Sequence, residues 1–497
     1  MPLPSGKPAD PLVIGLDLGT SACKAVALDS RGRVRITAQA SYSLKSDSEG
    51  RAEQDAHEVW QAVVSTLSDL TVQAGDLPLS GLSLSGAMHN FLPVDAGGEP
   101  LGPAMTWADT RPDARPLRAK ADPHTLYQRT GCPLQSIYHP AKLAWLARAQ
   151  PQTFAAAKRF VAIKDWVLYR LTGSLVTDSG LASTTGLLDI HRLVWDEEAM
   201  TLAGIRPEQL PELVSADTVV GGITDEAAAL TGLPPGLPVV AGSSDGGLAN
   251  LGAGVVVPGM TVVTVGTSAA IRHLSERPRF DPQARTWSYL LTPGRHFSGG
   301  AINSGGLVLE WVRRIFYSDL PRAAGFEALL EDATSSEPQR GDLVWLPYLA
   351  GERSPHWDPH LSATLYGLSL HHGREHLARA ALEGVAFCLA DVWQVLQPES
   401  RLGVRLTGNI TRTPAWAQLL ADVLGVPLEL VSAADASAVG AAMLGHEALG
   451  HVDGLDSLAE TVPGGHVLEP DQDRHDAYLG KHRNFQALFH SLHPGDR

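Results

Sequence analysis

The sequence contains few cysteines and no long apolar run. Its 497 residues include only Cys23, Cys132 and Cys388, and no two of them form a CxxC pair. This spacing argues against a zinc site built on paired cysteines and against a disulfide framework, and it is typical of a reducing compartment. No stretch approaches the ~20 apolar residues that span a bilayer. The first residues, MPLPSGKPADP, lack the apolar segment of a signal peptide. We therefore expect a cytoplasmic protein with no membrane partner.

Positive charge is also scarce. The net charge is −15, and no basic stripe with interleaved aromatic residues is present, which disfavours nucleic acid as a partner. The chain has no GxxxxGK[ST] pattern, no GxGxxG after a strand and, among its 19 histidines, no HExxH. These absences argue against a P-loop nucleotide-binding protein, a dinucleotide-binding protein and a zinc protease. The length predicts at least two domains.

A glycine turn, in contrast, occurs twice. Residues 15–26 (GLDLGTSACKAV) and 262–271 (VVTVGTSAAI) each place Gly-Thr-Ser-Ala between two short strands. Chance is one explanation in a chain with 49 glycines, but the matching positions indicate two similar α/β domains that face each other across a cleft. The Pro- and Gly-rich stretch 233–260 separates the repeats. We place the domains at 1–254 and 255–497.

Helical spacing is clear in three segments. Apolar residues recur on one face of 55–70, residues 376–396 form a strong helical pattern, and 436–449 is rich in small residues suited to close packing.

The two turns and two acidic residues suggest a chemistry. A Gly-Thr-Ser turn directs N–H groups and hydroxyls to one side, which forms a concavity for anions. Asp17 interrupts the apolar strand VIGLDLG, where burying an unpaired carboxylate costs free energy. A Mg²⁺ ion carried by a nucleotide is a natural partner for such a carboxylate. Asp245, in GSSDGG, follows an apolar strand and is flanked by approachable backbone. One acid for the metal and one for a proton is the minimum set for phosphoryl transfer to a hydroxyl. Plain hairpin turns, and an Asx turn at Asp245, remain alternatives.

With these residues in place, the chain resembles the FGGY carbohydrate kinases from about residue 12 to 480. The family's C-terminal signature fits ATLYGLSLHHGREHLARAALE (363–383), GLDLGTSACKAV is similar to its first phosphate motif, SSDGG to the segment of its catalytic aspartate and TVGTSA to its second phosphate motif. The stretches GAMHNFLPVD, TWADTR, TGCPLQSIY, GGAINSGGLVLEW and LPYLAGERSPHWD look most like gluconokinases, with xylulokinases next. The resemblance implies two ribonuclease-H-like domains of the actin-like ATPase superfamily flanking a catalytic cleft, with ATP and Mg²⁺ as cofactors.

The resemblance also implies roles for individual residues. Asp245 would be the general base, and Asp17 with Asp245 would hold the metal. Nucleotide contacts are implied for Thr20, Ser21, Lys24, Gly266, Thr267, Gly306, Gly408 and Asn409. Sugar contacts are implied for Met88, His89, Trp107, Asp109 and Asp245. Lys24 has an alternative as an exposed strand residue.

One loop departs from the family pattern. TGNITRTPAW (407–416) has Gly408 followed by Asn409, where the family usually has two glycines. Asn tolerates left-handed backbone angles better than most residues, so we expect ATP binding to persist with altered affinity.

The expected reaction is ATP-dependent phosphorylation of a terminal hydroxyl, with D-gluconate converted to 6-phosphogluconate. Xylulose or another pentulose or polyol is the alternative within the class. A nucleotide-driven switch and a non-catalytic sugar sensor are alternatives of other classes. A gluconate carboxylate needs a cation, for which Arg111, Arg272 and Arg353 are candidates. The small-molecule sugar is the expected partner, and a homodimer is one open assembly.

Overall fold

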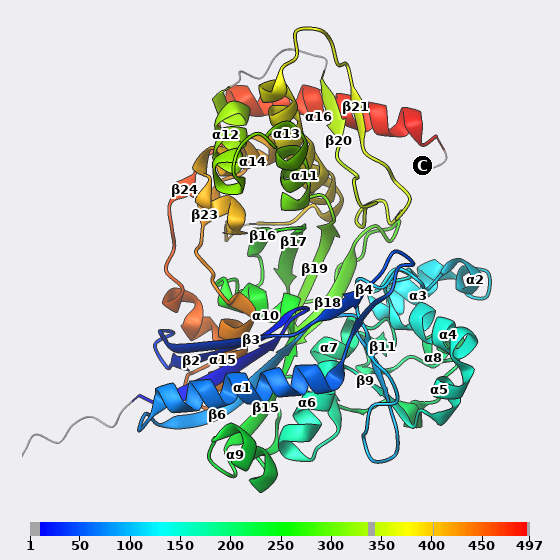
Figure 1. Cartoon of the computed structure of the whole chain (residues 1–497), viewed down its shortest axis with the longest axis vertical. Helices are drawn as coiled ribbons and strands as arrows, with labels where there is room; N and C mark the ends of the chain where they lie inside the picture. Colours follow the sequence, from blue (N-terminus) through cyan, green and yellow to red (C-terminus); the bar gives the residue numbers. More distant parts are fainter. Residues whose placement is uncertain (1–9, 336–342, 401, 495–497) are drawn as a thin grey trace, which may run out of the picture.

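The computed structural model describes residues 10–335, 343–400 and 402–494. Two mixed β-sheets organise the chain, one in each half (Figure 1). The first has the order β14-β15-β6-β1-β2-β3 and the second β18-β19-β17-β16-β22-β23-β24. The strands of the first sheet are β1 (Leu12–Leu18), β2 (Ala22–Asp29), β3 (Val34–Ser41), β6 (Leu79–Gly86), β14 (Val219–Gly222) and β15 (Pro238–Ser244). Those of the second are β16 (Thr261–Val265), β17 (Ala269–Ser275), β18 (Trp287–Thr292), β19 (Arg295–Ile302), β22 (Val404–Gly408), β23 (Leu428–Leu430) and β24 (Val467–Leu468).

The central strands of the two sheets have the same order and pairing directions, although in the second sheet the edge strand β18 comes between β17 and β19 along the chain. In the first sheet β1, β2 and β3 form an antiparallel meander, β1 pairs in parallel with β6, and β6 pairs in parallel with β15. In the second, β16, β17 and β19 are the three antiparallel neighbours, while β16–β22 and β22–β23 are the parallel pairs. The predicted pair of similar α/β domains is therefore confirmed, and each Gly-Thr-Ser turn joins the first two strands of its antiparallel set.

Helices cover these sheets. The helix α1 packs on β2 and β3, α15 packs on β1 and β6, and α13 packs on β17 and β19. These three are the segments with helical spacing, and α1 begins where the Asp55 side chain accepts hydrogen bonds from the N–H groups of His57 and Glu58. The longer helices are α1 (Ala56–Ala74), α3 (Pro123–Thr130), α4 (His139–Ala149), α6 (Ile163–Thr172), α10 (Asp245–Gly252), α11 (Gly306–Phe316), α12 (Arg322–Ser335), α13 (Arg374–Leu396), α14 (Pro414–Leu424), α15 (Ala436–Ala448) and α16 (Gln472–Leu492).

The remaining elements are short. The short helices are α2 (Arg115–Arg118), α5 (Pro151–Ala156), α7 (Ser179–Ser183), α8 (Glu197–Ala203) and α9 (Asp225–Thr231). Short strands pair as β4 (Leu44–Ser46) with β5 (Ala52–Gln54) and β8 (Ala104–Met105), β7 (Leu92–Val94) with β9 (Arg159–Val161), β10 (Val176–Asp178) with β13 (Glu212–Val214), β11 (Leu188–Asp189) with β12 (Val194–Trp195), and β20 (Val344–Leu346) with β21 (Thr364–Tyr366). None of the described helices combines the length and hydropathy that crossing a bilayer requires.

Small residues let α15 return from the second half of the chain onto the first sheet. A Cβ atom at Gly15 of β1 would lie 1.8 Å from the carbonyl oxygen of Ala438, so only glycine fits that crossing. The predicted boundary between 1–254 and 255–497 falls in the connection from α10 to β16. Because α10 packs on α15, these two helices join the halves directly, and the apolar cluster around them includes Val13 and Leu444 from opposite halves.

Candidate active site

Three strand ends of the first sheet carry predicted site residues. The strands β1, β6 and β15 are mutually parallel neighbours, so their carboxyl ends meet at one edge of the sheet. Asp17 lies near the end of β1, Met88 and His89 follow β6, and Asp245 follows β15. In open α/β sheets this edge is the place where ligands bind. The topology therefore brings together residues more than 200 positions apart in sequence.

The two acidic residues influence each other. The Ser85 hydroxyl donates a hydrogen bond of 2.6 Å to Asp17 Oδ1. Burial, and after it the charge of Asp245, raises the pKa of Asp17 to about 7. Burial likewise raises the pKa of Asp245, although the Gly246 N–H, which donates to Asp245 Oδ1 at 2.7 Å, and the charge of Arg272 oppose the shift. The charge of Asp245 therefore disfavours the charged form of Asp17, as at sites that bind a cation or handle a proton.

These two carboxylates fit a hydrated magnesium ion. The described residues contain no group of three or more His, Cys, Asp or Glu side chains arranged around a metal position. A cation beside Asp17 and Asp245 would relieve their mutual repulsion. Mg²⁺ keeps several water ligands and takes one or two carboxylates together with substrate phosphates, so a pair of acids is the donor set that it requires.

The two Gly-Thr-Ser turns are similar but differ in length, with four residues between the paired Leu18 and Cys23 and three between Val265 and Ala269. In the first, the Gly19 N–H donates to the carbonyl of Ala22 at 3.1 Å, and in the second the Gly266 N–H donates to the carbonyl of Ser268 at 2.9 Å. Ser21 is exposed at the tip of the first turn. Each turn thus bends back on itself at its glycine, and the N–H groups and hydroxyls that follow are available to an anion.

Other predicted nucleotide residues gather at the second turn. The start of α11 docks on it, because the Gly306 N–H donates to the carbonyl of Gly266 at 2.8 Å. Gly408 ends β22 with φ +93°, and a Cβ there would lie 2.3 Å from the carbonyl oxygen of Val265. Asn409 is exposed and opens a 3₁₀ turn, Asn409–Arg412. The positive φ angle occurs at Gly408. The residue that differs from the family pattern is Asn409, so the position that requires this backbone angle is still a glycine.

Lys24 is engaged by a partner that the sequence did not indicate. Its Nζ lies 2.9 Å from Oδ1 of Asp435, at the start of α15. Asp435 has a left-handed backbone with φ +51°. A phosphate contact by Lys24 would therefore compete with this ion pair between the two halves.

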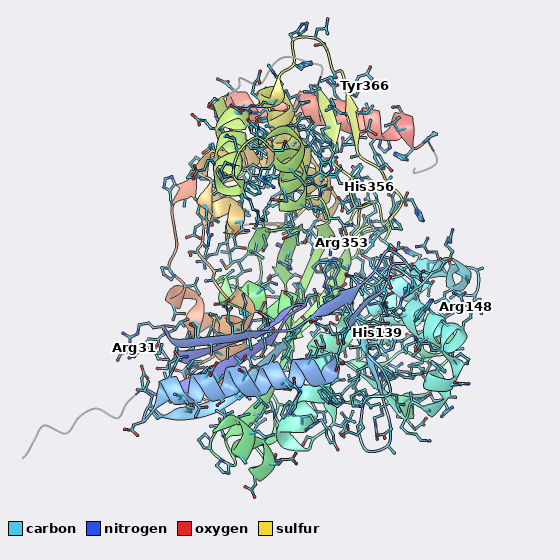
Figure 2. The ribbon with its side chains drawn as sticks, in the orientation of Figure 1. Arg31, His139, Arg148, Arg353, His356 and Tyr366 are labelled. Atoms are coloured by element: carbon cyan, nitrogen blue, oxygen red, sulfur yellow. The ribbon has the colours of Figure 1, made fainter. Side chains whose placement is uncertain are left out.

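A cavity of about 260 Å³ opens at the strand ends. Its lining includes five of the predicted residues, namely Thr20, Met88, His89, Trp107 and Asp245. The rest of the wall comes mainly from the second half of the chain, with Ile137, Tyr138, Ser268, Ala269, Ala270, Arg272, Trp287, Tyr289, Ala301, Arg353 and Trp357. Figure 2 shows Arg353 midway along the molecule, between the two sets of helices. The cavity is therefore built jointly by both halves.

Two of the predicted sugar residues are held in defined orientations. Nδ1 of His89 lies 2.8 Å from the carbonyl oxygen of Thr184. Burial lowers the pKa of His89 well below its ordinary value, so the ring is neutral, and a carbonyl partner requires the proton on Nδ1. Nε2 is then an acceptor that a sugar hydroxyl can use. The Trp107 indole N–H donates to the Thr20 hydroxyl at 3.0 Å, which links the cavity to the first turn.

Asp109 does not line this cavity. It is 3% exposed, its Oδ2 accepts a hydrogen bond from the N–H of Ala52 at 3.0 Å, and its carboxylate pairs with Arg111, which also binds Glu53. Arg111 stacks on Trp145 at 4.4 Å. Both Asp109 and Arg111 are thus satisfied within the protein. Asp109 is held by partners within the protein, two residues along the chain from Trp107, and its sugar contact stays a prediction.

Sequence reasoning missed the aromatic wall. The hydroxyls of Tyr138 and Tyr289 are 2.7 Å apart, and Tyr138 packs edge-on against His89 at 5.2 Å. The ring of Trp287 stacks on Tyr289 at 4.5 Å. These residues come from different halves and share no local motif. The only sequence signal was the quoted stretch TGCPLQSIY, which ends at Tyr138.

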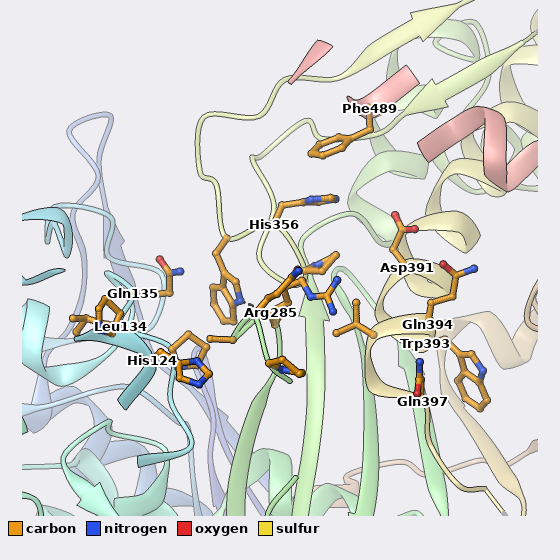
Figure 3. Close-up of a pocket in the computed structure, with 18 of the residues that line it drawn as sticks. His124, Leu134, Gln135, Arg285, His356, Asp391, Trp393, Gln394, Gln397 and Phe489 are labelled. Atoms are coloured by element: carbon orange, nitrogen blue, oxygen red, sulfur yellow. Dashed lines mark hydrogen bonds between the residues drawn. The ribbon is translucent and has the colours of Figure 1, made fainter. Parts of the chain in front are cut away.

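A larger cavity of about 1350 Å³ lies on the other side of Trp357, which lines both spaces. Figure 3 shows its wall, with His124, Leu134 and Gln135 from the first half facing His356, Asp391 and Phe489 from the second. None of the predicted site residues lines it. Arg285 on this wall is paired with Asp281. The chemistry-bearing residues therefore belong to the smaller cavity.

Known proteins share this architecture. The chain matches the FGGY family of carbohydrate kinases, N-terminal domain, over residues 12–252 and the C-terminal domain of the same family over residues 261–449. It is 34% identical to a gluconokinase of Bacillus subtilis over 493 residues, covering 97% of this chain and 95% of that protein. The crystal structure of a gluconate kinase from Lactobacillus acidophilus superposes with a TM-score of 0.92 at 28% identity, covering 98% of this chain and 99% of that one. A xylulose kinase from Rhodospirillum rubrum gives 0.90 at 32% identity, covering 97% and 99%. With both domains matched in order along one two-domain fold, the chain belongs to the FGGY family of carbohydrate kinases.

Proposed function

We propose that this kinase transfers the γ-phosphoryl group of ATP to the terminal hydroxyl of D-gluconate, giving 6-phosphogluconate. The observation that carries the proposal is the position of Asp245. It lines a cavity of about 260 Å³, a size that suits a six-carbon open-chain sugar acid, and it interacts electrostatically with Asp17 at the adjacent strand end.

The residues divide the chemistry between them. Asp245 accepts the proton of the attacking hydroxyl and, above all, orients it, because phosphoryl transfer depends on positioning and charge stabilisation more than on covalent help. The raised pKa of Asp245, caused by burial, makes it a better proton acceptor than an exposed carboxylate. Thr20 and Ser21 on one turn, and Gly266 and Thr267 on the other, supply donors for the phosphates.

The proposal also assigns a binding site to the magnesium ion. Asp17 and Asp245 would hold Mg²⁺ through its water ligands, and the ion supplies neutralisation of phosphate charge. The cavity walls formed by Tyr138, Tyr289 and Trp357 exclude water from the transferred group, which protects it from hydrolysis.

The choice of gluconate over a neutral ketose has two supports. The more similar curated relatives carry the name gluconokinase, and the cavity wall includes two cationic side chains, Arg272 and Arg353. Xylulose is the second candidate, because relatives and superposable structures named xylulose kinases cover nearly the whole chain. The three cysteines are free and buried, which is compatible with the reducing cytoplasm that we propose for the protein.

Coupled ADP-release kinetics test the proposal. We expect the highest kcat/KM with gluconate among gluconate, xylulose, ribulose, glycerol and erythritol. A preference for xylulose would replace the substrate and keep the reaction class. ADP release that ignores every sugar would favour a nucleotide switch, and the absence of ADP release with the whole panel would favour a sugar sensor.

A further inference from the structure

One strand presents a short row of residues to the cavity. Ser268, directly before β17, and Ala270 and Arg272 within it all line the cavity. Ser268, Ala270 and Arg272 alternate along the chain as residues on one face of a strand do, and Ala269 between them also lines the cavity. Ser268 and Ala270 are small, so this face is open until Arg272, which supplies its only charge.

The guanidinium of Arg272 is incompletely satisfied. Its Nη1 donates a long hydrogen bond of 3.3 Å to the Thr264 hydroxyl, and its Nε is buried without an acceptor. The Nε lies 3.6 Å from the position that a Cβ atom on Gly246 would occupy, which places it beside Asp245. Among the described residues no carboxylate lies within ion-pair distance of Arg272; burial lowers its pKa, and the nearby charge of Asp245 opposes that shift. A guanidinium offers five N–H donors, and the Thr264 hydroxyl is the acceptor found for one of them among the described residues.

The other two candidate arginines differ in this respect. Arg353 donates from Nε to Asn303 Oδ1 at 2.8 Å and from Nη2 to the carbonyl of Ile302 at 3.0 Å. Arg111 pairs with two carboxylates outside the cavity. Two nitrogens of Arg353 are thus bound within the protein, against one of Arg272, and Arg111 is paired outside the cavity, so Arg272 is the least satisfied of the three.

We propose that Arg272 binds the carboxylate of an open-chain sugar acid and is the residue that selects such acids over neutral sugars. This inference rests on the proposed function. An arginine fork pairs with a carboxylate through two parallel N–H···O bonds, which would supply the missing acceptors. A neutral ketose has no carboxylate and cannot form these two charge-assisted hydrogen bonds, which disfavours its binding relative to a sugar acid.

A matched pair of ligands isolates the carboxylate. D-Gluconate and D-glucitol have the same carbon chain and differ in a carboxylate against a hydroxymethyl group. We would measure the dissociation constants of both, in the presence of ADP, for the wild type and for Arg272→Met, together with kcat/KM for gluconate. We expect the gluconate dissociation constant to rise about 100-fold, with kcat/KM falling in parallel, while the glucitol constant changes by less than about threefold.

Two further variants serve as controls for Arg272→Met. Arg272→Lys keeps the charge and loses the fork, so it should retain part of the preference for gluconate. Arg353→Met removes the other cavity arginine and should weaken both ligands to a similar extent. If Arg272→Met does not fold, Arg272→Gln removes the charge in its place, and the ratio of the gluconate and glucitol constants is measured on that variant.

The outcomes separate the two proposals. If gluconate and glucitol weaken equally in the Arg272 variants, the residue serves the phosphoryl end or the packing of the site, and its assignment is overturned. If the wild type prefers neutral ketoses to gluconate, the proposed function itself fails, whatever the variants do. A loss of the gluconate preference confined to the Arg272 variants supports both.

Discussion

Replacing Asp245 with asparagine should separate activity from stability. The substitution keeps the shape of the side chain and an oxygen that can accept the 2.7 Å hydrogen bond from the Gly246 N–H. It removes the negative charge and the proton acceptor. The structure therefore predicts a specific chemical loss without a cavity or a steric clash.

The expected rate loss follows from the role of a general base. Such a group contributes about 10²–10⁴-fold, so kcat for Asp245→Asn should fall by about 10³, with KM for ATP within about threefold of the wild type. The stability of the folded state, in contrast, should not decrease. The charge of Asp245 is the second cause, after burial, of the raised pKa of Asp17, and such like-charge repulsion destabilises the folded state. Its removal should leave the melting temperature equal to that of the wild type or higher.

The assay is coupled ADP release at saturating gluconate, with a thermal melt of the same preparations. A variant with wild-type kcat would refute the role of Asp245 as base. A melting temperature that falls by several degrees together with the activity would refute the electrostatic reasoning, because the loss would then be structural.

Three further predictions concern residues around the site. Asp109→Asn should lower the melting temperature, because it breaks a buried pair with Arg111, and it should leave KM for gluconate within about threefold. Gly408→Ala should raise KM for ATP by about tenfold or more, since the added Cβ overlaps a neighbouring carbonyl oxygen; Gly403→Ala is the matched control, with φ +103° and nothing within 4 Å of the Cβ position. Burial lowers the pKa of Lys142 to about 7, whereas a lysine in an unfolded chain has a pKa of about 10.4. Between these two pH values the unfolded state binds more protons than the folded state. The free energy of unfolding should therefore rise with pH from about 7 to 10. Urea denaturation of Lys142→Met should show a smaller rise over that window, and an identical rise would contradict the origin that we give it.

The sequence was sufficient for the elements that local chemistry controls. The repeated Gly-Thr-Ser turns, the strands beside them and the helices at 55–70, 376–396 and 436–449 are each specified by spacing and by glycine within one short segment. The same holds for the positions of Asp17 and Asp245, because a carboxylate inside or after an apolar strand stands out against its neighbours. Placing each nucleotide residue at its phosphate remains a prediction.

The tertiary structure decided which of these residues meet and which charges are already satisfied. Asp17, His89 and Asp245 share one edge only because three parallel strands are neighbours in the sheet. Asp109 was expected at the sugar; it is not among the residues that line the cavity, and its carboxylate is bound by the N–H of Ala52 and by Arg111. Lys24 meets Asp435 across 411 positions, a pairing that no local pattern contains. The physical reason is that a side chain's type is written in the sequence, whereas its desolvation and its partners depend on chain segments that approach only when the domain folds.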